Sequence, residues 1–115
     1  MGQLCNVIPP PEDDTTTITN IQSATNVIHN HNCCRLQCDG TVVTNGGIAN
    51  NIPSDLCPKK DVTGIILGLE NNINQPCYIT ISTTGVVTAR LFRSDGSVGN
   101  FSGYMAGSIT WLRNN

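Results

Sequence analysis

The chain has 115 residues, which is enough for one compact domain and too few for two. Charged residues make up only 12% of it, against about a quarter in an average soluble protein, and its formal net charge is -2. Phosphate binding requires clustered Lys and Arg, so this composition argues against a nucleic-acid partner. No apolar run approaches the roughly 18 residues of a membrane helix, so no membrane partner is predicted.

The first 24 residues are predicted to form an extended N-terminal arm or linker. Pro9–Pro11 favour an extended polyproline conformation, and the acidic run Glu12–Asp14 that follows offers nothing to bury. Such an arm could become ordered by lying across a neighbouring subunit. We expect residues 25–115 to form one β-rich assembly domain.

Short strands separated by turn residues are predicted in the first half of this domain. Residues 17–34 are rich in β-branched side chains, which favours one or two strands. Thr41–Thr44 reads as a short strand that ends at the turn Asn45–Gly47, and Asn50–Lys60, with two prolines, reads as a loop.

The second half of the chain continues in the same way. Val62–Leu69 is almost wholly apolar, as expected of a strand that is covered on both faces or buried between subunits. Asn71–Pro76 is predicted to be a polar connection. Cys77–Ile81 and Val86–Phe92 are predicted to form a hairpin around the dipeptide Thr84-Gly85.

Phe101–Leu112 supplies the last strand or strands, with Ile109 and Trp111 on one face and Thr110 and Leu112 on the other. The chain is therefore predicted to be all-β: an antiparallel sandwich, jelly-roll-like, or an intertwined β trimer, with an extended N-terminal arm.

Aromatic residues are scarce, at 4%, so a lone monomer would have a thin core. Oligomerisation or covalent cross-links would supply what the core lacks, so we expect a homo-oligomer. The apolar residues expected to be buried between subunits are Ile65, Ile66, Leu67, Ile109 and Trp111.

Six cysteines in so short a chain indicate either a disulfide framework or a metal site. Disulfide bonding is the preferred interpretation because the spacing contains no CxxC pair. The alternative is that some of the cysteines are buried free thiols. The disulfide candidates are Cys5, Cys33, Cys34, Cys38, Cys57 and Cys77, and Cys5 in the arm is the candidate for a bond between subunits.

His29 and His31 form a His-x-His pair. Residues two apart on a strand point to the same side, so both imidazoles would project from one face, and three such pairs around a threefold axis could saturate a transition-metal ion. The alternatives are two exposed polar residues, or a zinc site with Cys33, Cys34 or Cys38. Apart from this possible metal ion, no cofactor is expected.

A catalytic function is not expected. A Cys–His pair could act as nucleophile and base, but the sequence shows no positioned third residue and no oxyanion loop. Most carboxylates lie in predicted turns, where Asp commonly bonds to its own backbone. No catalytic residue is assigned.

The segments Cys77–Leu91 and Gly103–Leu112 resemble the C-terminal domains of bacteriophage tail and head fibre proteins, in which a strand, a Thr-Gly turn, a second strand and a terminal Gly-Ser-Ile-Thr-aromatic strand recur. The resemblance implies a trimeric β-structure on a virion surface, with roles in attachment, architecture or binding of a host-surface receptor. A homo-oligomer, with a trimer favoured, that also contacts other subunits of the particle is therefore expected. His-x-His pairs that hold a metal ion on the trimer axis occur in such fibres, and His29 and His31 would match them.

Cys33-Cys34 after a long arm, together with the Thr- and Asn-rich composition, is similar to the endospore appendage subunits of bacilli. This second resemblance implies a small jelly-roll protein that self-assembles through disulfide cross-links on a spore surface. We expect a structural subunit at a virion surface or capsid, or alternatively such an appendage subunit. A secreted, disulfide-rich binding module is the third possibility.

Overall fold

The computed structural model describes residues 16–93 and 95–113, and these residues form an all-β protein without an α-helix. The predicted all-β class is thereby confirmed. The elements are β1 (Thr17–Gln22), β2 (Thr25–His29), β3 (Cys33–Val43), the 3-10 turn η2 (Ser54–Leu56), β4 (Val62–Glu70), β5 (Ile73–Ile81), β6 (Val87–Phe92), β7 (Val98–Asn100) and β8 (Gly103–Leu112).

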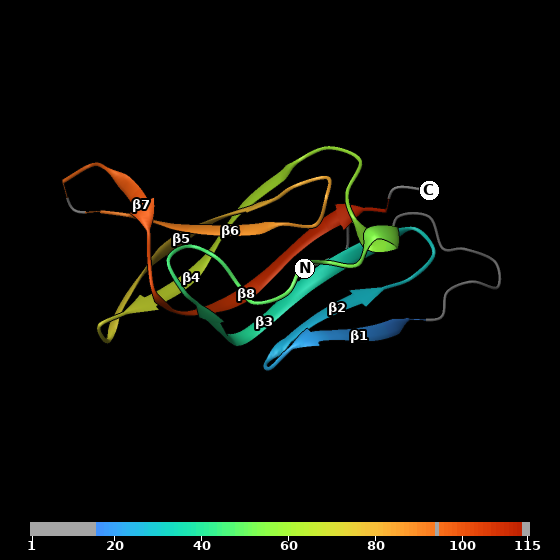
Figure 1. The fold of residues 1–115 in the computed structure, drawn as a ribbon, viewed down its shortest axis with the longest axis horizontal. Coiled ribbons are helices and arrows are strands. Elements are labelled where there is room, and N and C mark those ends of the chain that lie inside the picture. Colours follow the sequence, from blue (N-terminus) through green and yellow to red (C-terminus); the bar gives the residue numbers. More distant parts are fainter. Residues whose placement is uncertain (1–15, 94, 114–115) are drawn as a thin grey trace.

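The described strands join in one antiparallel sheet of order β1-β2-β3-β8-β4-β5-β6-β7. Figure 1 shows β1, β2, β3 and β8 on one side of the molecule and β4, β5 and β6 on the other. The two halves meet where β4 and β8 pair over only three residue pairs, from Leu67↔Ala106 to Leu69↔Tyr104. The sheet folds over at this junction, and both halves cover one core.

Gly107 in β8 allows the close approach at the fold of the sheet. Its φ is +136°, and a Cβ atom there would lie 2.8 Å from the Cβ atom of Ile66 in β4. A larger residue would separate the two halves of the sheet.

Alternation of the side chains along the strands produces the core. In β3, Cys34, Leu36 and Cys38 are buried, while the two residues between them are partly exposed. Ile109 and Trp111 in β8 are buried and Leu112 is exposed, as predicted for the last strand.

The segment between β3 and β4 closes one side of the core. The backbone N–H of Ala89 in β6 donates to the carbonyl of Gly46 at 2.8 Å, and the N–H of Ile52 donates to the carbonyl of Gly85 at 2.9 Å. Ile52 and Leu56, which belong to this segment, are buried in the core. A region predicted to be a simple loop is therefore part of the core.

Several predicted boundaries differ from the observed ones. Residues 17–22, at the end of the predicted arm, form β1, whereas residues 1–15 lie outside the described residues. The short strand expected at Thr41–Thr44 is the end of the longer strand β3. The connection expected at Asn71–Pro76 was wrong, because β5 already begins at Ile73. The hairpin between β5 and β6 is confirmed, with Gly85 in its turn.

Candidate functional site

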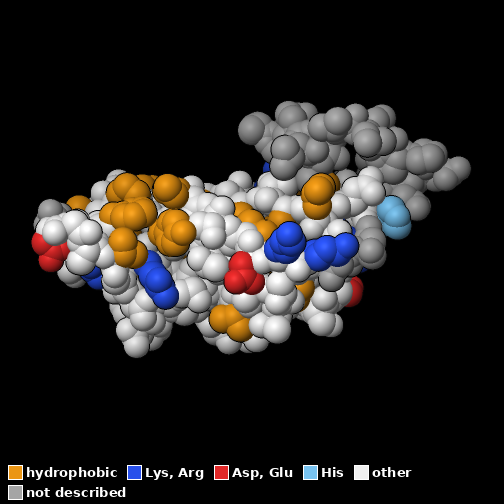
Figure 2. All heavy atoms as spheres, turned by 90° about the horizontal axis from the view of Figure 1, so that it is seen from above, with side chains coloured by type: hydrophobic (Ala, Val, Ile, Leu, Met, Phe, Trp, Pro, Cys, Tyr) orange, Lys and Arg blue, Asp and Glu red, His pale blue; other side chains and the backbone are white. Residues whose placement is uncertain are grey.

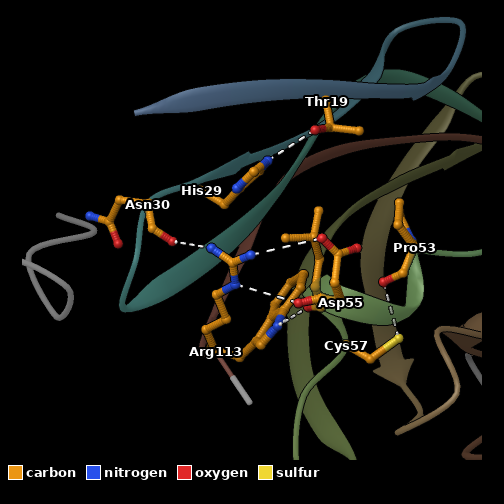
Figure 3. Close-up of polar contacts among 9 residues, drawn as sticks. Thr19, His29, Asn30, Pro53, Asp55, Cys57 and Arg113 are labelled. Atoms are coloured by element: carbon orange, nitrogen blue, oxygen red, sulfur yellow. Dashed lines mark hydrogen bonds and ion pairs between the residues drawn. The ribbon is translucent and has the colours of Figure 1, made fainter. Parts of the chain in front are cut away.

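The predicted histidine pair does not share a strand. His29 is the last residue of β2, and His31 is exposed in the bend that leads to β3. The premise that both imidazoles project from one strand face is therefore wrong. His29 Nε2 lies 2.9 Å from the hydroxyl oxygen of Thr19 in β1 (Figure 3). Partial burial lowers the pKa of His29, and the nearby Arg113 cation lowers it further.

Arg113 holds together the end of the molecule around His29. One of its guanidinium nitrogens donates to the carbonyl of Asn30 at 2.8 Å, and another lies 3.8 Å from a carboxylate oxygen of Asp55 (Figure 3). The indole N–H of Trp111 donates to the carbonyl of Leu56 at 2.9 Å. These bonds fasten η2 and the bend after β2 to the end of β8. Their geometry suits a structural role, in which they hold these segments together.

The cysteines lie mainly inside the core. Cys34, Cys38, Cys57 and Cys77 have free thiols that are at most 4% exposed, so the alternative interpretation, buried free thiols, describes them. Cys33 takes part in a disulfide bond. Cys5, the candidate for a bond between subunits, lies outside the described residues.

Burial keeps these thiols protonated. It raises the pKa of Cys34 to about 11 and that of Cys77 to about 12. The pKa values of Cys38 and Cys57 are also raised, mainly by burial. Because the thiolate is the reactive form, these side chains behave as small apolar groups at neutral pH.

Within residues 16–93 and 95–113, no cluster of three or more His, Cys, Asp or Glu side chains could hold a metal ion. In the same part of the chain, no helix is both long and apolar enough to cross a bilayer.

The expected inter-subunit residues divide into two groups. Ile66, Ile109 and Trp111 are buried in the core of the chain itself, whereas Ile65 and Leu67 point outward from β4 and are 63% and 45% exposed. The alternation along β4 thus separates residues that the sequence pattern grouped together.

Ile65 and Leu67 belong to a continuous apolar surface on the outer face of the sheet. Ile65 pairs with Tyr78 and Leu67 pairs with Pro76, both in β5. The ring of Tyr78 lies edge-on to that of Phe92 in β6, with 5.8 Å between the ring centroids, and Phe92 pairs with Val98 in β7. We call this surface the outer apolar strip; its members are Ile65, Leu67, Pro76, Tyr78, Phe92 and Val98.

The outer apolar strip is open to solvent. Phe92 is 40% exposed and Val98 is 44% exposed. Hydrophobic side chains gather toward the β7 end of the face seen in Figure 2. Of the residues that β4, β5, β6 and β7 direct to this face, from Thr63 to Asn100, Arg90 is the only charged one. Sequence reasoning found Ile65 and Leu67 and missed Phe92 and Val98, which join them only through the pairing of four strands.

No protein-family description matches the chain, and no curated protein is significantly similar to its sequence.

Proposed function

We propose that the chain is a non-enzymatic structural subunit that assembles with copies of itself on the surface of an extracellular particle. The observation that carries the proposal is the outer apolar strip. Monomeric proteins rarely expose contiguous apolar patches of more than a few hundred Å², and larger ones mark interaction sites. The exposed Phe92 and Leu67, on a sheet face to which these strands direct Arg90 as the single charged side chain, support an interaction site here.

The strip has the composition of the centre of an interface. Such centres are poor in charged residues and rich in aromatic residues, and their hydrogen-bonding groups lie at the rim. Here Tyr78 and Phe92 lie at the middle of the strip, and the ion pair between Arg93 and Glu70 lies near its border. Burying the strip would supply the apolar area that a domain with few aromatic residues lacks in isolation.

The particle we propose is a virion, and the subunit a fibre or capsid decoration protein with a role in attachment or architecture. This narrower assignment is supported by the resemblance of the segments around β5, β6 and β8 to phage fibre domains. A disulfide-joined appendage subunit is the alternative. Cys34, Cys38, Cys57 and Cys77 are buried free thiols, whereas Cys33 takes part in a disulfide bond.

The test is the mass of the native protein by light scattering, for the wild type and for the variants Leu67→Glu and Val86→Glu. Leu67 and Val86 are 45% and 44% exposed, but only Leu67 lies in the strip, so Val86→Glu is the matched control. We expect a wild-type oligomer, a smaller mass for Leu67→Glu at equal concentration, and no change for Val86→Glu. Circular dichroism confirms that both variants are folded.

The same samples on reducing and non-reducing gels separate the particle classes. A discrete trimer that survives reduction supports the fibre assignment, whereas long polymers that reduction dissolves support the appendage. A wild-type monomer at all concentrations would overturn the proposal and favour a secreted binding module. A Leu67→Glu oligomer identical to that of the wild type would exclude the strip as the assembly surface.

A further inference from the structure

The strand β1 lies at one edge of the sheet. Within the described residues β1 pairs with β2 on one side only. Every second residue of an edge strand directs its N–H and C=O groups outward, where they can pair with another strand. Natural proteins usually protect such edges with Lys, Pro or very short strands. β1 has six residues, Thr-Ile-Thr-Asn-Ile-Gln, with neither a charge nor a proline among them.

The opposite edge of the sheet, formed by β7, is protected against pairing with another strand. β7 has only three residues. The guanidinium of Arg93 donates to the carbonyl of Asn100 at the end of β7, at 2.8 Å, and places a charge there. The two edges therefore differ in length and charge. On β1 the carbonyl of Ile21 accepts from the side-chain amide of Asn50. Within the described residues, Thr17–Thr19 pair only with β2, so this end of β1 is the one suited to pairing.

Ile18 adds an apolar contact to this edge. It is 64% exposed, and it pairs with the half-buried Ile28 on β2. The two side chains form a small apolar row on the outer side of the β1–β2 hairpin, and this row ends at the open edge. A strand added there would cover Ile18 only if it placed an apolar side chain beside it.

A second copy of β1 meets this requirement. When two copies of a strand pair antiparallel around a twofold axis, moving one residue forward along one copy means moving one residue back along the other. The residues that lie opposite each other must also point to the same face of the sheet. The register that pairs Ile18 with Ile18 of the second copy satisfies both conditions and pairs Thr17 with Thr19. It creates one continuous row of Ile28, Ile18 and their two equivalents. Because β1 is uncharged, the copies do not repel each other.

We propose that β1 pairs antiparallel with β1 of a second copy around a twofold axis at Ile18, so that the two sheets become one. The inference deepens the proposed function and rests on it. In this register only Thr17–Thr19 of each β1 pair with each other, which is too short a contact to bury the roughly 800 Å² per partner of a stable interface. The edge contact therefore acts together with the outer apolar strip, and two different contacts per subunit allow an assembly larger than a dimer. Because a twofold contact joins subunits in pairs, a discrete trimer would exclude the edge contact and leave the proposed function standing.

The first test compares Ile18→Lys with Leu112→Lys by light scattering across a range of concentrations. Leu112 is 65% exposed, matching Ile18, but it lies on β8, which is not an edge strand. Two lysines opposite each other across the pair repel, so we expect Ile18→Lys to raise the concentration needed for assembly by about tenfold or more. Leu112→Lys is expected to assemble like the wild type.

The second test determines the register with Ile18→Cys and Asn20→Cys, each oxidised mildly with diamide and run on non-reducing gels beside the wild type. Opposite residues in an antiparallel pair are close enough for a disulfide, whereas in the proposed register residue 20 faces residue 16 of the second copy. We expect a new cross-linked dimer for Ile18→Cys, at several times the yield for Asn20→Cys.

The outcomes separate the two proposals. An oligomer that Ile18→Lys leaves unchanged, or cross-linking at residue 20 as strong as at residue 18, overturns the edge contact and leaves the proposed function standing. A wild-type monomer removes the proposed function itself. Circular dichroism shows whether each variant is folded, and the cross-linking test introduces no charge.

Discussion

Trp111 illustrates what one side chain contributes. Its ring is 4% exposed and fills the core, while its indole N–H donates to the carbonyl of Leu56, 55 positions away in the chain. The burial follows from the alternation along the last strand, so the sequence predicts it. The hydrogen bond does not follow from any local pattern, because it depends on where the segment between β3 and β4 crosses the core.

Gly85, in the turn between β5 and β6, is constrained by both backbone conformation and space. Its φ is +87°, and a Cβ atom would collide with the carbonyl oxygen of Ile52 and lie 3.0 Å from the sulfur of Cys57. We expect Gly85→Ala to lower the free energy of unfolding by about 3 kcal/mol, through strain and displacement of the segment that covers the core. Urea denaturation measures the change.

Gly96→Ala is the matched control for this substitution. Gly96 has a similar φ of +89°, but nothing lies within 4 Å of the added Cβ atom. Its substitution should cost only the backbone strain, about 1 to 2 kcal/mol. Equal losses for the two variants would show that the contact with Ile52 contributes nothing.

At the scale of the element, β3 shows why the sequence analysis predicted too short a strand. Cys34, Leu36 and Cys38 alternate with polar residues, which is the pattern of a half-buried strand. When the cysteines are considered only as disulfide or metal candidates, this alternation is lost and only the Val-rich end of the strand is recognised. Cysteines that act as small apolar residues restore the full strand.

The hairpin between β4 and β5 was missed for a different reason. Asn, Gln and Pro are uncommon in strands, so Asn71–Pro76 resembles a loop. The structure closes the hairpin with the pair Glu70↔Ile73 and a two-residue turn, in which Asn71 and Asn72 have φ values of 53° and 62°. Two positive φ values in a two-residue loop are typical of a type I′ turn, which tolerates Asn.

This turn gives a prediction for the element. Asn72→Val is expected to lower the free energy of unfolding by about 1 to 2 kcal/mol, because β-branched residues are strained at positive φ, whereas Asn72→Gly should be neutral or slightly stabilising. Thermal or urea denaturation distinguishes the two. Asn74→Val, at an exposed strand position of β5, is the control and should change stability little. A stable Asn72→Val variant would contradict the assigned turn.

At the scale of the whole molecule, the sequence was sufficient for the all-β class but not for the surface. Which apolar residues face out depends on how four strands align, and the outer apolar strip exists only after Phe92 has been paired with Val98 and placed beside Tyr78. The same holds for the position of β1 at an edge of the sheet, because strand order is set by contacts between residues far apart in the chain.

The buried thiols provide a prediction for the whole fold. Cys34, Cys38, Cys57 and Cys77 should react with a soluble maleimide only when the structure opens, so their labelling in the native protein should be at least about a thousandfold slower than in urea. Mass spectrometry of timed samples at neutral pH identifies each labelled site. Rapid labelling of any of these residues in the native protein would contradict the burial described for it.

The position of these thiols also makes the outcome of unfolding depend on whether the thiols have been oxidised. A chain that unfolds in air exposes neighbouring sulfur atoms to oxidation, and pairs formed at random then obstruct the return to the native sheet. A heating curve followed by cooling should therefore retrace itself in the presence of a reductant and fail to do so without one. In the particle proposed above, the working lifetime would then depend on how rarely a subunit unfolds rather than on its melting temperature.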